Sequence, residues 1–426
     1  MFEKKTLKRV GAFALTGALA VTLAACSSGG DSKDSGGTKL TGDPVKIMVT
    51  GPINSQTAAF PTSVDAAVIW GKAANVGDGI AGHPVEIITC DNKWDPNATA
   101  DCARDAVSEG VVAVVGYAGG GEDQLISILG EADIPWLPGA TTGAPVGYEA
   151  ENSFPVSLGS FQAVARALLA KKYDCKSPAL FLADLPSLQL NVDLAQRTLK
   201  QEGIPAAKLV QYPLTAADLA PYVANLKGAD CVIDTGNPES ITAKLGPALA
   251  QSGLTFKRLI FSPSLSDTII AQAPDVWGGK TSLASYYTWP TKTNEWADYL
   301  KAVDKYASYD KKKFSYETSG AQGSWIATSV VADVAGKILD AGNELTAKSL
   351  LEALSKATEV DTGGVAPVLN FTKLSTVPNF PRLFNPSAGF ASVDKEGKIV
   401  PEPSGYHSLL GPIEGKATTD KFFSPK

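Results

Sequence analysis

The most constraining feature of the sequence is a repeated alternation of short apolar segments with amphipathic ones, starting near residue 45. Four apolar segments open the series: VKIMVTG, HPVEIITC, VVAVVG and IPWLPGA. Nearly continuous apolar strands that alternate with amphipathic helices are typical of a parallel β-sheet covered on both faces. Asp95 and Pro96 stand where the second helix would begin, since Asp favours the N-cap and Pro the first helical position.

The alternation resumes after residue 160, with the apolar segments SPALFLAD, AKLVQYPL, ADCVIDTG and KRLIFSPS. A chain of 426 residues is long for a single core of this kind. We therefore predict an α/β protein with two doubly wound, Rossmann-like lobes, each built on a parallel sheet. Three late segments, GGVAPVLNF, SAGFASVD and GKIVPEP, predict further strands or a hairpin.

The first 25 residues have the pattern of a signal peptide, with a basic head followed by an apolar run. This run is shorter than the ~20 apolar residues that a membrane-spanning helix needs. It ends in Leu-Ala-Ala-Cys, which resembles the lipobox of bacterial lipoproteins and implies cleavage before Cys26 and acylation of that residue. We therefore expect a lipid anchor on the outer face of the bacterial cytoplasmic membrane. An ordinary secretory signal with an incidental cysteine is the alternative.

Residues 26–43 are rich in Gly, Ser and Asp and predict a flexible tether. Loss of residues 1–25 would remove four basic and one acidic residue from the totals of 38 and 44, which leaves a net charge of −9. No dense basic segment offsets this charge. Nucleic acid is therefore not an expected partner.

Cysteine usage agrees with export. Besides Cys26 the chain contains Cys90, Cys102, Cys175 and Cys231. An even number in an oxidising compartment predicts two disulfides, for which three pairings are possible. We favour Cys90–Cys102, because the first residue ends a strand and the second lies early in the next helix. The pair Cys175–Cys231 would then join two strands that can be neighbours at one sheet edge.

The glycine-rich segment VVGYAGGGED follows the third strand and first suggests a phosphate site. A P-loop requires Gly-Lys-Ser/Thr, whereas Gly121 precedes Glu122 and Asp123, and this segment does not match the GxGxxG pattern of dinucleotide-binding loops. No GxSxG elbow is present, and His83 and His407 are the only histidines available as a base or a zinc ligand. We therefore expect no enzyme, metal or cofactor, with an extracellular hydrolase as a weaker alternative.

The order of these elements resembles the type I periplasmic binding fold, and more narrowly the leucine-binding (branched-chain amino acid) family of ABC-transporter solute receptors. The resemblance rests on VKIMVTGPINSQTAAF, on the stretch from CDNKWDPNATADC to VVGYAGGG, on IPWLPGATTG and on the second series of strands. It implies two lobes that close on a small solute and are joined by three crossovers, near residues 152–160, 280–292 and 359–375.

The resemblance also implies a division of the chain. The expected parts are a signal peptide (1–25), a tether (26–43), an N-terminal lobe (44–155 plus 285–360), a C-terminal lobe (156–284 plus 361–400) and a C-terminal extension (401–426).

Site residues follow from loops that match those of the family. They are Phe60 as an aromatic cover, Tyr117 with Gly119, Gly120 and Gly121 in the carboxylate-binding loop, Ala140, Thr141 and Thr142 in a second such loop, and Asp184, Asn237 and Ser264 in the second lobe. Two departures matter: the glycine loop lacks the expected hydroxyl near Gly120, and Ser264 stands where amino acid binders tend to carry an acidic residue. A buried ammonium would then be poorly compensated, unless Asp184 or Glu239 serves instead.

Together these features predict a monomeric solute-binding lipoprotein that delivers a small polar or amphipathic molecule to an ABC permease. An amino acid, an amide or an organic acid would fit. A receptor of the same fold that signals rather than transports is the alternative.

Overall fold

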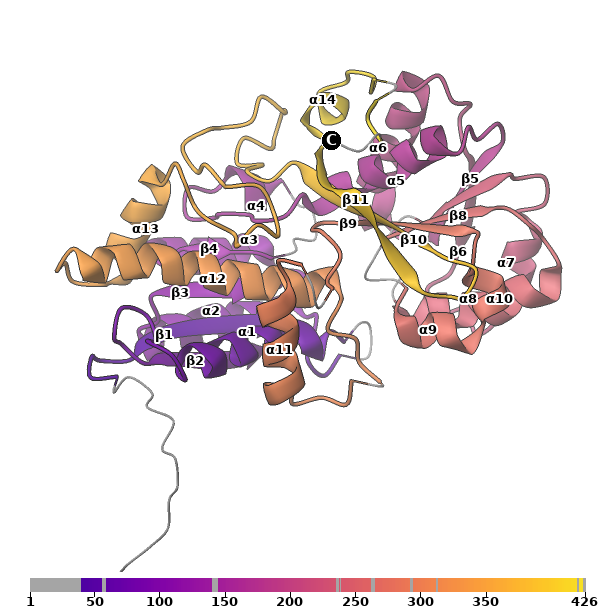
Figure 1. The fold of residues 1–426 in the computed structure, drawn as a ribbon. Coiled ribbons are helices and arrows are strands. Elements are labelled where there is room, and N and C mark those ends of the chain that lie inside the picture. Colours follow the sequence, from indigo (N-terminus) through magenta and orange to yellow (C-terminus); the bar gives the residue numbers. More distant parts are fainter. Residues whose placement is uncertain are drawn as a thin grey trace, which may run out of the picture. The chain divides into compact units, whose positions relative to one another are not determined.

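The computed structural model of the chain describes residues 40–423, apart from residues 56–58, 140–144, 235–236, 238, 262–264, 292–293, 312 and 420. The predicted signal peptide, Cys26 and most of the tether lie outside the described residues, as do Ala140, Thr141, Thr142 and Ser264. Among the helices that are described, none is both long and apolar enough to span a membrane. Figure 1 shows two sheets with helices on their faces.

The first sheet has four parallel strands. Their spatial order is β2 (Val85–Asp91), β1 (Val45–Gly51), β3 (Ala113–Gly116) and β4 (Trp136–Leu137). Helices α1 (Pro61–Ala74) and α12 (Ser319–Asp340) cover one face, and α2 (Pro96–Glu109) and α3 (Glu122–Glu131) cover the other. Side chains of β1 alternate between the two cores, Ile47 and Val49 on the α1 side and Met48 on the α2 side. We call this sheet and its helices the first lobe.

The second sheet has seven strands and forms the second lobe. Their spatial order is β11 (Ile399–Ser408), β10 (Ser387–Val393), β9 (Thr281–Ser285), β8 (Lys257–Phe261), β7 (Cys231–Asp234), β5 (Pro178–Ala183) and β6 (Lys208–Tyr212). Strands β5 to β9 are parallel, whereas β9–β10 and β10–β11 pair antiparallel.

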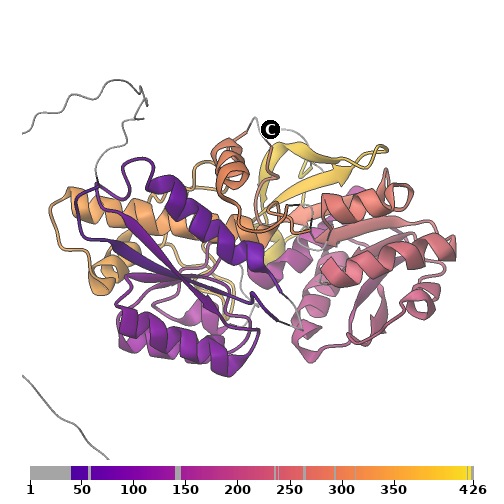
Figure 2. The ribbon, with the colours of Figure 1, turned by 90° about the horizontal axis from the view of Figure 1, so that it is seen from below.

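Helices also cover both faces of the second sheet. On one face lie α5 (Gln162–Lys172) and α6 (Gln189–Gln201). On the other lie α7 (Ala220–Ala224), α8 (Glu239–Ser252), α9 (Asp267–Gln272) and α10 (Pro274–Trp277). The prediction of two lobes with parallel sheets is confirmed, and the predicted late hairpin is β10–β11, which carries the yellow end of the chain in Figure 2.

The chain passes between the lobes three times, after β4, after β9 and before β10. After β9 it forms α11 (Ala297–Tyr306) and α12, which pack on α1, and then α13 (Ala347–Lys356). The buried Tyr287 ties two of these passages together, because its hydroxyl donates to the carbonyl oxygen of Gly139 at 2.9 Å. Strand β11 extends to Ser408, so residues 401–408 belong to the second sheet rather than to an extension beyond it.

Both favoured disulfides are present. Cys90–Cys102 joins the end of β2 to α2, with Cα atoms 5.7 Å apart. Cys175–Cys231 joins the segment before β5 to the start of β7, with Cα atoms 5.9 Å apart, and these strands are neighbours. The predicted start of α2 is also confirmed, since the side chain of Asp95 accepts a hydrogen bond from the Ala98 amide at 2.9 Å.

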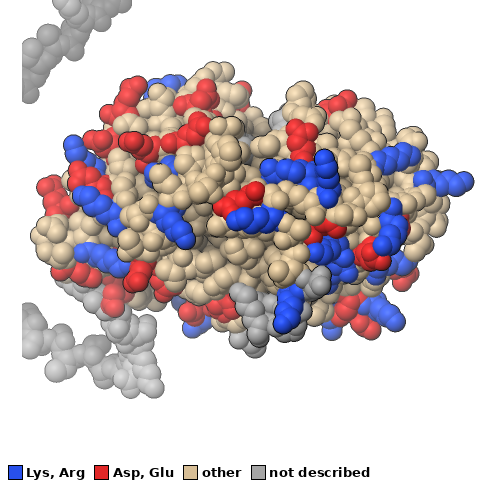
Figure 3. Space-filling model, turned by 90° about the horizontal axis from the view of Figure 1, so that it is seen from above, with Lys and Arg blue, Asp and Glu red and all other residues tan. Residues whose placement is uncertain are grey.

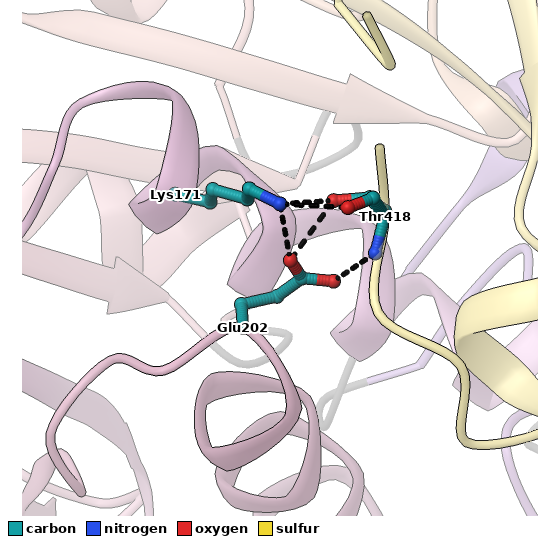
Figure 4. Close-up of polar contacts among 3 residues, drawn as sticks. All are labelled: Lys171, Glu202 and Thr418. Carbon is teal, nitrogen blue, oxygen red and sulfur yellow. Dashed lines mark hydrogen bonds and ion pairs between the residues drawn. The ribbon is translucent and has the colours of Figure 1, made fainter. Parts of the chain in front are cut away.

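The C-terminal segment is held against α5 and α6 by a polar contact that Figure 4 shows. The buried carboxylate of Glu202 accepts hydrogen bonds from Lys171 Nζ at 2.7 Å, from the Thr418 amide at 2.7 Å and from the Thr418 hydroxyl at 2.9 Å. Nearby, the buried His407 ring packs against Phe422 and the neighbouring phenylalanines. This histidine is therefore part of a hydrophobic contact and not a solvent-accessible base.

Candidate binding site

The glycine loop between β3 and α3 has a backbone that only glycine adopts easily. Gly119, Gly120 and Gly121 have φ values of +64°, +105° and +71°. At Gly121 a Cβ atom would lie 2.9 Å from Pro96 Cα, so close approach to α2 also requires glycine there. The loop follows the carboxyl end of a parallel strand, where ligands of such sheets bind.

Asn92 fixes the start of this loop. Its buried amide group donates to the carbonyl oxygens of Tyr117 at 2.6 Å and Ala118 at 2.9 Å, while its oxygen accepts from the Trp94 amide at 3.1 Å. The hydroxyl of Thr99 on α2 donates to the same Ala118 carbonyl at 2.8 Å. Since these acceptors are backbone atoms, Asn92 and Thr99 constrain the path of the loop.

The neighbouring Asp91 holds the loop after β1. Its carboxylate accepts hydrogen bonds from the amides of Ile53 at 2.9 Å, Asn54 at 3.1 Å and Lys93 at 3.0 Å. Burial opposes ionisation of this carboxylate, but the hydrogen bonds outweigh burial and lower its pKa. We call Asp91–Asp95, which Cys90–Cys102 anchors to α2, the bracket, because it holds the loops after β1 and β3.

Three aromatic side chains meet beside the glycine loop. The ring centroids of Phe60 and Tyr117 are 6.0 Å apart, and Trp94 lies 5.8 Å from the first and 5.3 Å from the second. All three side chains are half-buried. The structure therefore brings together Phe60, Tyr117 and the glycines, as expected. Sequence reasoning missed Trp94, although its place in the loop after β2 put it at the same sheet edge.

The second lobe presents Tyr286, which directly follows β9, and Phe261, which ends β8; their ring centroids are 4.7 Å apart. Burial raises the pKa of Tyr286 well above its usual value, and the nearby Tyr117 of the first lobe raises it further. Electrostatic coupling of this kind requires that Tyr117 and Tyr286 lie near each other. The carboxyl ends of both sheets thus contribute aromatic rings to one region.

This geometry can be compared with known proteins. The model of a family described as periplasmic binding protein matches residues 44–375. The chain belongs to the periplasmic binding protein family. No curated protein sequence is significantly similar to it.

Three solved structures illustrate the similarity of this periplasmic binding protein to others. A solute-binding protein of an ABC transporter from R. palustris, in complex with 4-hydroxybenzoate, is 18% identical, with a TM-score of 0.69 and coverage of 86% of this chain and 97% of that one. A leucine-binding protein from Thermotoga maritima is 19% identical (TM-score 0.64; coverage 84% and 97%). A fatty acid-binding protein of an ABC transporter from Thermomonospora curvata is 14% identical (TM-score 0.67; coverage 88% and 95%). At these identities the likeness shows the fold.

Two other predicted site residues of this periplasmic binding protein are engaged within the second lobe. Asn237 is buried; its side-chain oxygen accepts a hydrogen bond from the Tyr212 hydroxyl, and its backbone N–H donates to Asp234 Oδ1 at 3.0 Å. Asp184 is exposed and accepts a hydrogen bond from Gln211 at 3.3 Å. Among the described residues, no hydrogen bond joins Asn237 or Asp184 to the aromatic cluster around Tyr117 or to the pair of Phe261 and Tyr286.

A cavity of about 610 Å³ lies between the two lobes. Helices α9 and α10 and the β10–β11 turn line it on the side of the second lobe, and α11 with Lys311 and residues 315–317 lines it on the side of the first. Trp289, Asp267 and Glu317 line it. Burial raises the pKa of Glu317 to about 7, the nearby Asp267 raises it further, and a hydrogen bond from Trp289 opposes the shift. Burial also raises the pKa of Asp267. In this periplasmic binding protein, burial thus opposes ionisation of Glu317 from the first lobe and of Asp267 from the second.

The surface of the periplasmic binding protein in Figure 3 carries interspersed basic and acidic side chains. That face shows no basic stripe of the kind that nucleic-acid binders use.

Proposed function

We propose that this chain is an extracytoplasmic receptor that captures a small solute between its two lobes and delivers it to an ABC permease. The observation that carries the proposal is the presence of aromatic rings at the carboxyl edges of both sheets, the cluster around Tyr117 in the first lobe and the pair of Phe261 and Tyr286 in the second. A solute that contacts both edges favours the closed arrangement, because it binds that state more tightly than an open one.

The proposed contacts in the first lobe come from the aromatic rings and from the glycine loop. Backbone N–H groups of Gly119–Gly121 would hold an oxygen of the solute, and Phe60, Trp94 and Tyr117 would cover its apolar part. Ala140, Thr141 and Thr142 are proposed to complete this side, and Ser264 the opposite side. The two lobes that close on the solute would be residues 44–155 with 285–360, and residues 156–284 with 361–408, where β11 ends.

The solutes of the similar structures define which compounds to test first, since they include an aromatic acid, amino acids and fatty acids. A thermal-shift screen of amino acids, amides, aromatic acids and aliphatic acids is the direct experiment. A true ligand at about 100 times its dissociation constant adds about 2.7 kcal/mol to the free energy of unfolding. Absence of stabilisation by any compound, including the mixture of solutes present in growth medium, would contradict solute binding.

Calorimetric titration of variants tests the location. Phe60→Ala should weaken binding of a stabilising compound about tenfold or more, because it removes a ring that covers the solute. Leu209→Ala is the matched control, since Leu209 is an exposed apolar residue on edge strand β6. Equal affinity of Phe60→Ala and the control would move the site elsewhere.

The proposed membrane attachment depends on Cys26. Intact mass of membrane-extracted protein should correspond to a chain that begins at an acylated Cys26, and Cys26→Ser should release the protein from the membrane. Uptake of the labelled ligand should fall in cells that lack the protein if it delivers solute, and stay unchanged if the protein serves only as a sensor.

A further inference from the structure

Arg166 is a fully buried cation at the edge of the second sheet where the proposed solute lies. Its side chain has 0% exposure, and none of its three guanidinium nitrogens has a hydrogen-bond partner among the described residues. A guanidinium carries five N–H donors, and buried donors are nearly always paired in folded proteins. We therefore ask which molecule accepts the hydrogen bonds of Arg166.

The position of the guanidinium follows from its neighbours. Arg166 Nη1 is 3.8 Å from Asp234 Oδ1, and its Cζ atom is 5.5 Å from the centroid of the Phe261 ring. Asp234 ends β7 and Phe261 ends β8, while Tyr286, which couples electrostatically to Arg166, follows β9. Arg166 thus lies at the carboxyl ends of three adjacent parallel strands, on the side of the second lobe that meets Tyr117.

The contact with Asp234 does not account for the donors of Arg166. At 3.8 Å the two groups attract each other, but the distance is too long for a hydrogen bond. A buried ion pair whose guanidinium makes no hydrogen bond seldom stabilises a fold, because desolvation of both charges opposes their attraction. Burial accordingly lowers the pKa of Arg166 to about 10, despite the nearby Asp234.

Two other arginines of the second lobe and its connections differ from Arg166, although Nε and Nη1 of the buried Arg258 and Nη2 of the half-buried Arg382 also lack hydrogen-bond partners among the described residues. Arg258 lies between two rings, with its Cζ 5.3 Å from Phe256 and 5.7 Å from Trp277. Arg382 donates to the Ser153 carbonyl at 2.6 Å and also stacks on aromatic rings. Arg166 has one ring and no hydrogen bond, and it is the one of these three that lies at the proposed site.

We propose that Arg166 binds an anionic group of the solute, so that the ligand of this protein carries a carboxylate that the second lobe recognises. This inference rests on the proposed function and names the class of its solute. A guanidinium pairs with a carboxylate through two parallel N–H···O bonds, which an amide or an alcohol cannot match. Since Arg166 is buried, its side chain or the groups that cover it must shift as the solute binds.

Matched pairs of probes test the ligand class. Benzoate and benzamide, hexanoate and hexanamide, and leucine and leucinamide are titrated against the wild-type protein by thermal shift and calorimetry. We expect at least one carboxylate to bind, and to bind at least tenfold more tightly than its carboxamide. Carboxamide binding as tight as carboxylate binding would overturn the inference and leave the proposed function standing. Absence of binding by all six probes would count against both.

Variants separate a solute contact from a structural ion pair. Arg166→Met keeps the size of the side chain and should weaken carboxylate binding roughly 10- to 100-fold, while Arg166→Lys should weaken it less, because it keeps the charge but not the planar fork. Circular dichroism and the melting temperature without ligand establish that each variant is folded.

Asp234→Asn gives the sharpest distinction, because the two interpretations predict opposite signs. If Arg166 binds the solute, loss of the competing carboxylate should strengthen carboxylate binding. If Arg166 only neutralises Asp234, the single variant should weaken binding, and the double variant Arg166→Met/Asp234→Asn should restore it. Restoration by the double variant, or unchanged affinity in folded Arg166→Met, would overturn the inference.

Discussion

Glu317 should make the stability of this protein fall as the pH rises from about 4.5 to above 7. The carboxyl group lines the cavity between the lobes, accepts a hydrogen bond from Trp289 and lies near Asp267. Burial raises its pKa from 4.5 to about 7, with Asp267 as the second cause. The folded protein therefore keeps the proton of Glu317 at a pH where the unfolded chain has released it. Between these two pKa values release of the proton stabilises only the unfolded chain, so the free energy of unfolding falls, and above pH 7 the difference stays constant.

The magnitude follows from the size of the shift. Each pKa unit corresponds to about 1.4 kcal/mol, so the raised pKa of Glu317 gives a loss of about 3 kcal/mol between pH 4.5 and pH 8.5. Glu317→Gln is the perturbation of choice, since glutamine keeps an oxygen that accepts from Trp289 but has no titratable proton. Relative to the wild type, the variant should become more stable by about 3 kcal/mol as the pH rises across this range.

Urea denaturation at pH 4.5, 6.0, 7.5 and 8.5 measures this difference, and other titrating groups cancel in the comparison of the two proteins. Glu344→Gln serves as the control, because Glu344 is exposed. Asp267→Asn should remove part of the pH dependence, since it removes the neighbouring charge. Parallel curves for the wild type and Glu317→Gln would refute the reasoning, because they would mean that the cavity wall does not oppose ionisation of Glu317.

Three further predictions concern the bracket and the C-terminal segment. Glu202→Gln should destabilise the protein by about 1–3 kcal/mol, through loss of charged hydrogen bonds, and should speed tryptic cleavage after the exposed Lys416, as gel analysis would show. Replacement of Cys90 and Cys102 by Ser should cost about 3 kcal/mol in urea denaturation, from the 12-residue separation. Trp94→Ala should weaken solute binding about tenfold in calorimetry with little change in melting temperature, because the ring is half-buried.

The lobes and disulfides could be predicted from the sequence because they depend on local patterns. Each parallel strand of the two sheets is a short, largely apolar segment, and this pattern is visible without knowledge of the strand's partners. The pairing of Cys90 with Cys102 needed only the expectation of a strand end followed by a helix start. The extent of β11 was missed, because Pro401, Pro403 and Gly405 interrupt the apolar pattern within it.

The site was harder to predict, because its residues depend on contacts between distant parts of the chain. The resemblance assigned Phe60 and Tyr117 to the same proposed site, and their ring centroids lie 6.0 Å apart. Nothing local marks Asn92 as the residue that holds the glycine loop, since its partners lie 25 and 26 residues away. Arg166 has the sequence context of an ordinary exposed helix residue, and only its burial against the ends of β7 and β8 distinguishes it.

The two lobes contribute different chemistry to the proposed site. The first lobe would hold an oxygen of the solute, and the second lobe would select which class of solute binds. The bracket constrains a backbone whose N–H groups donate hydrogen bonds to any suitably placed oxygen, so the first lobe has little basis for discriminating an acid from an amide. A guanidinium does discriminate, because its fork is complementary to a carboxylate. Variants of Asn92 should therefore weaken the binding of acids and of amides alike, whereas variants of Arg166 should change the ratio of the affinities for an acid and for its amide. A changed ratio in Asn92→Ala would show that the first lobe also selects the solute.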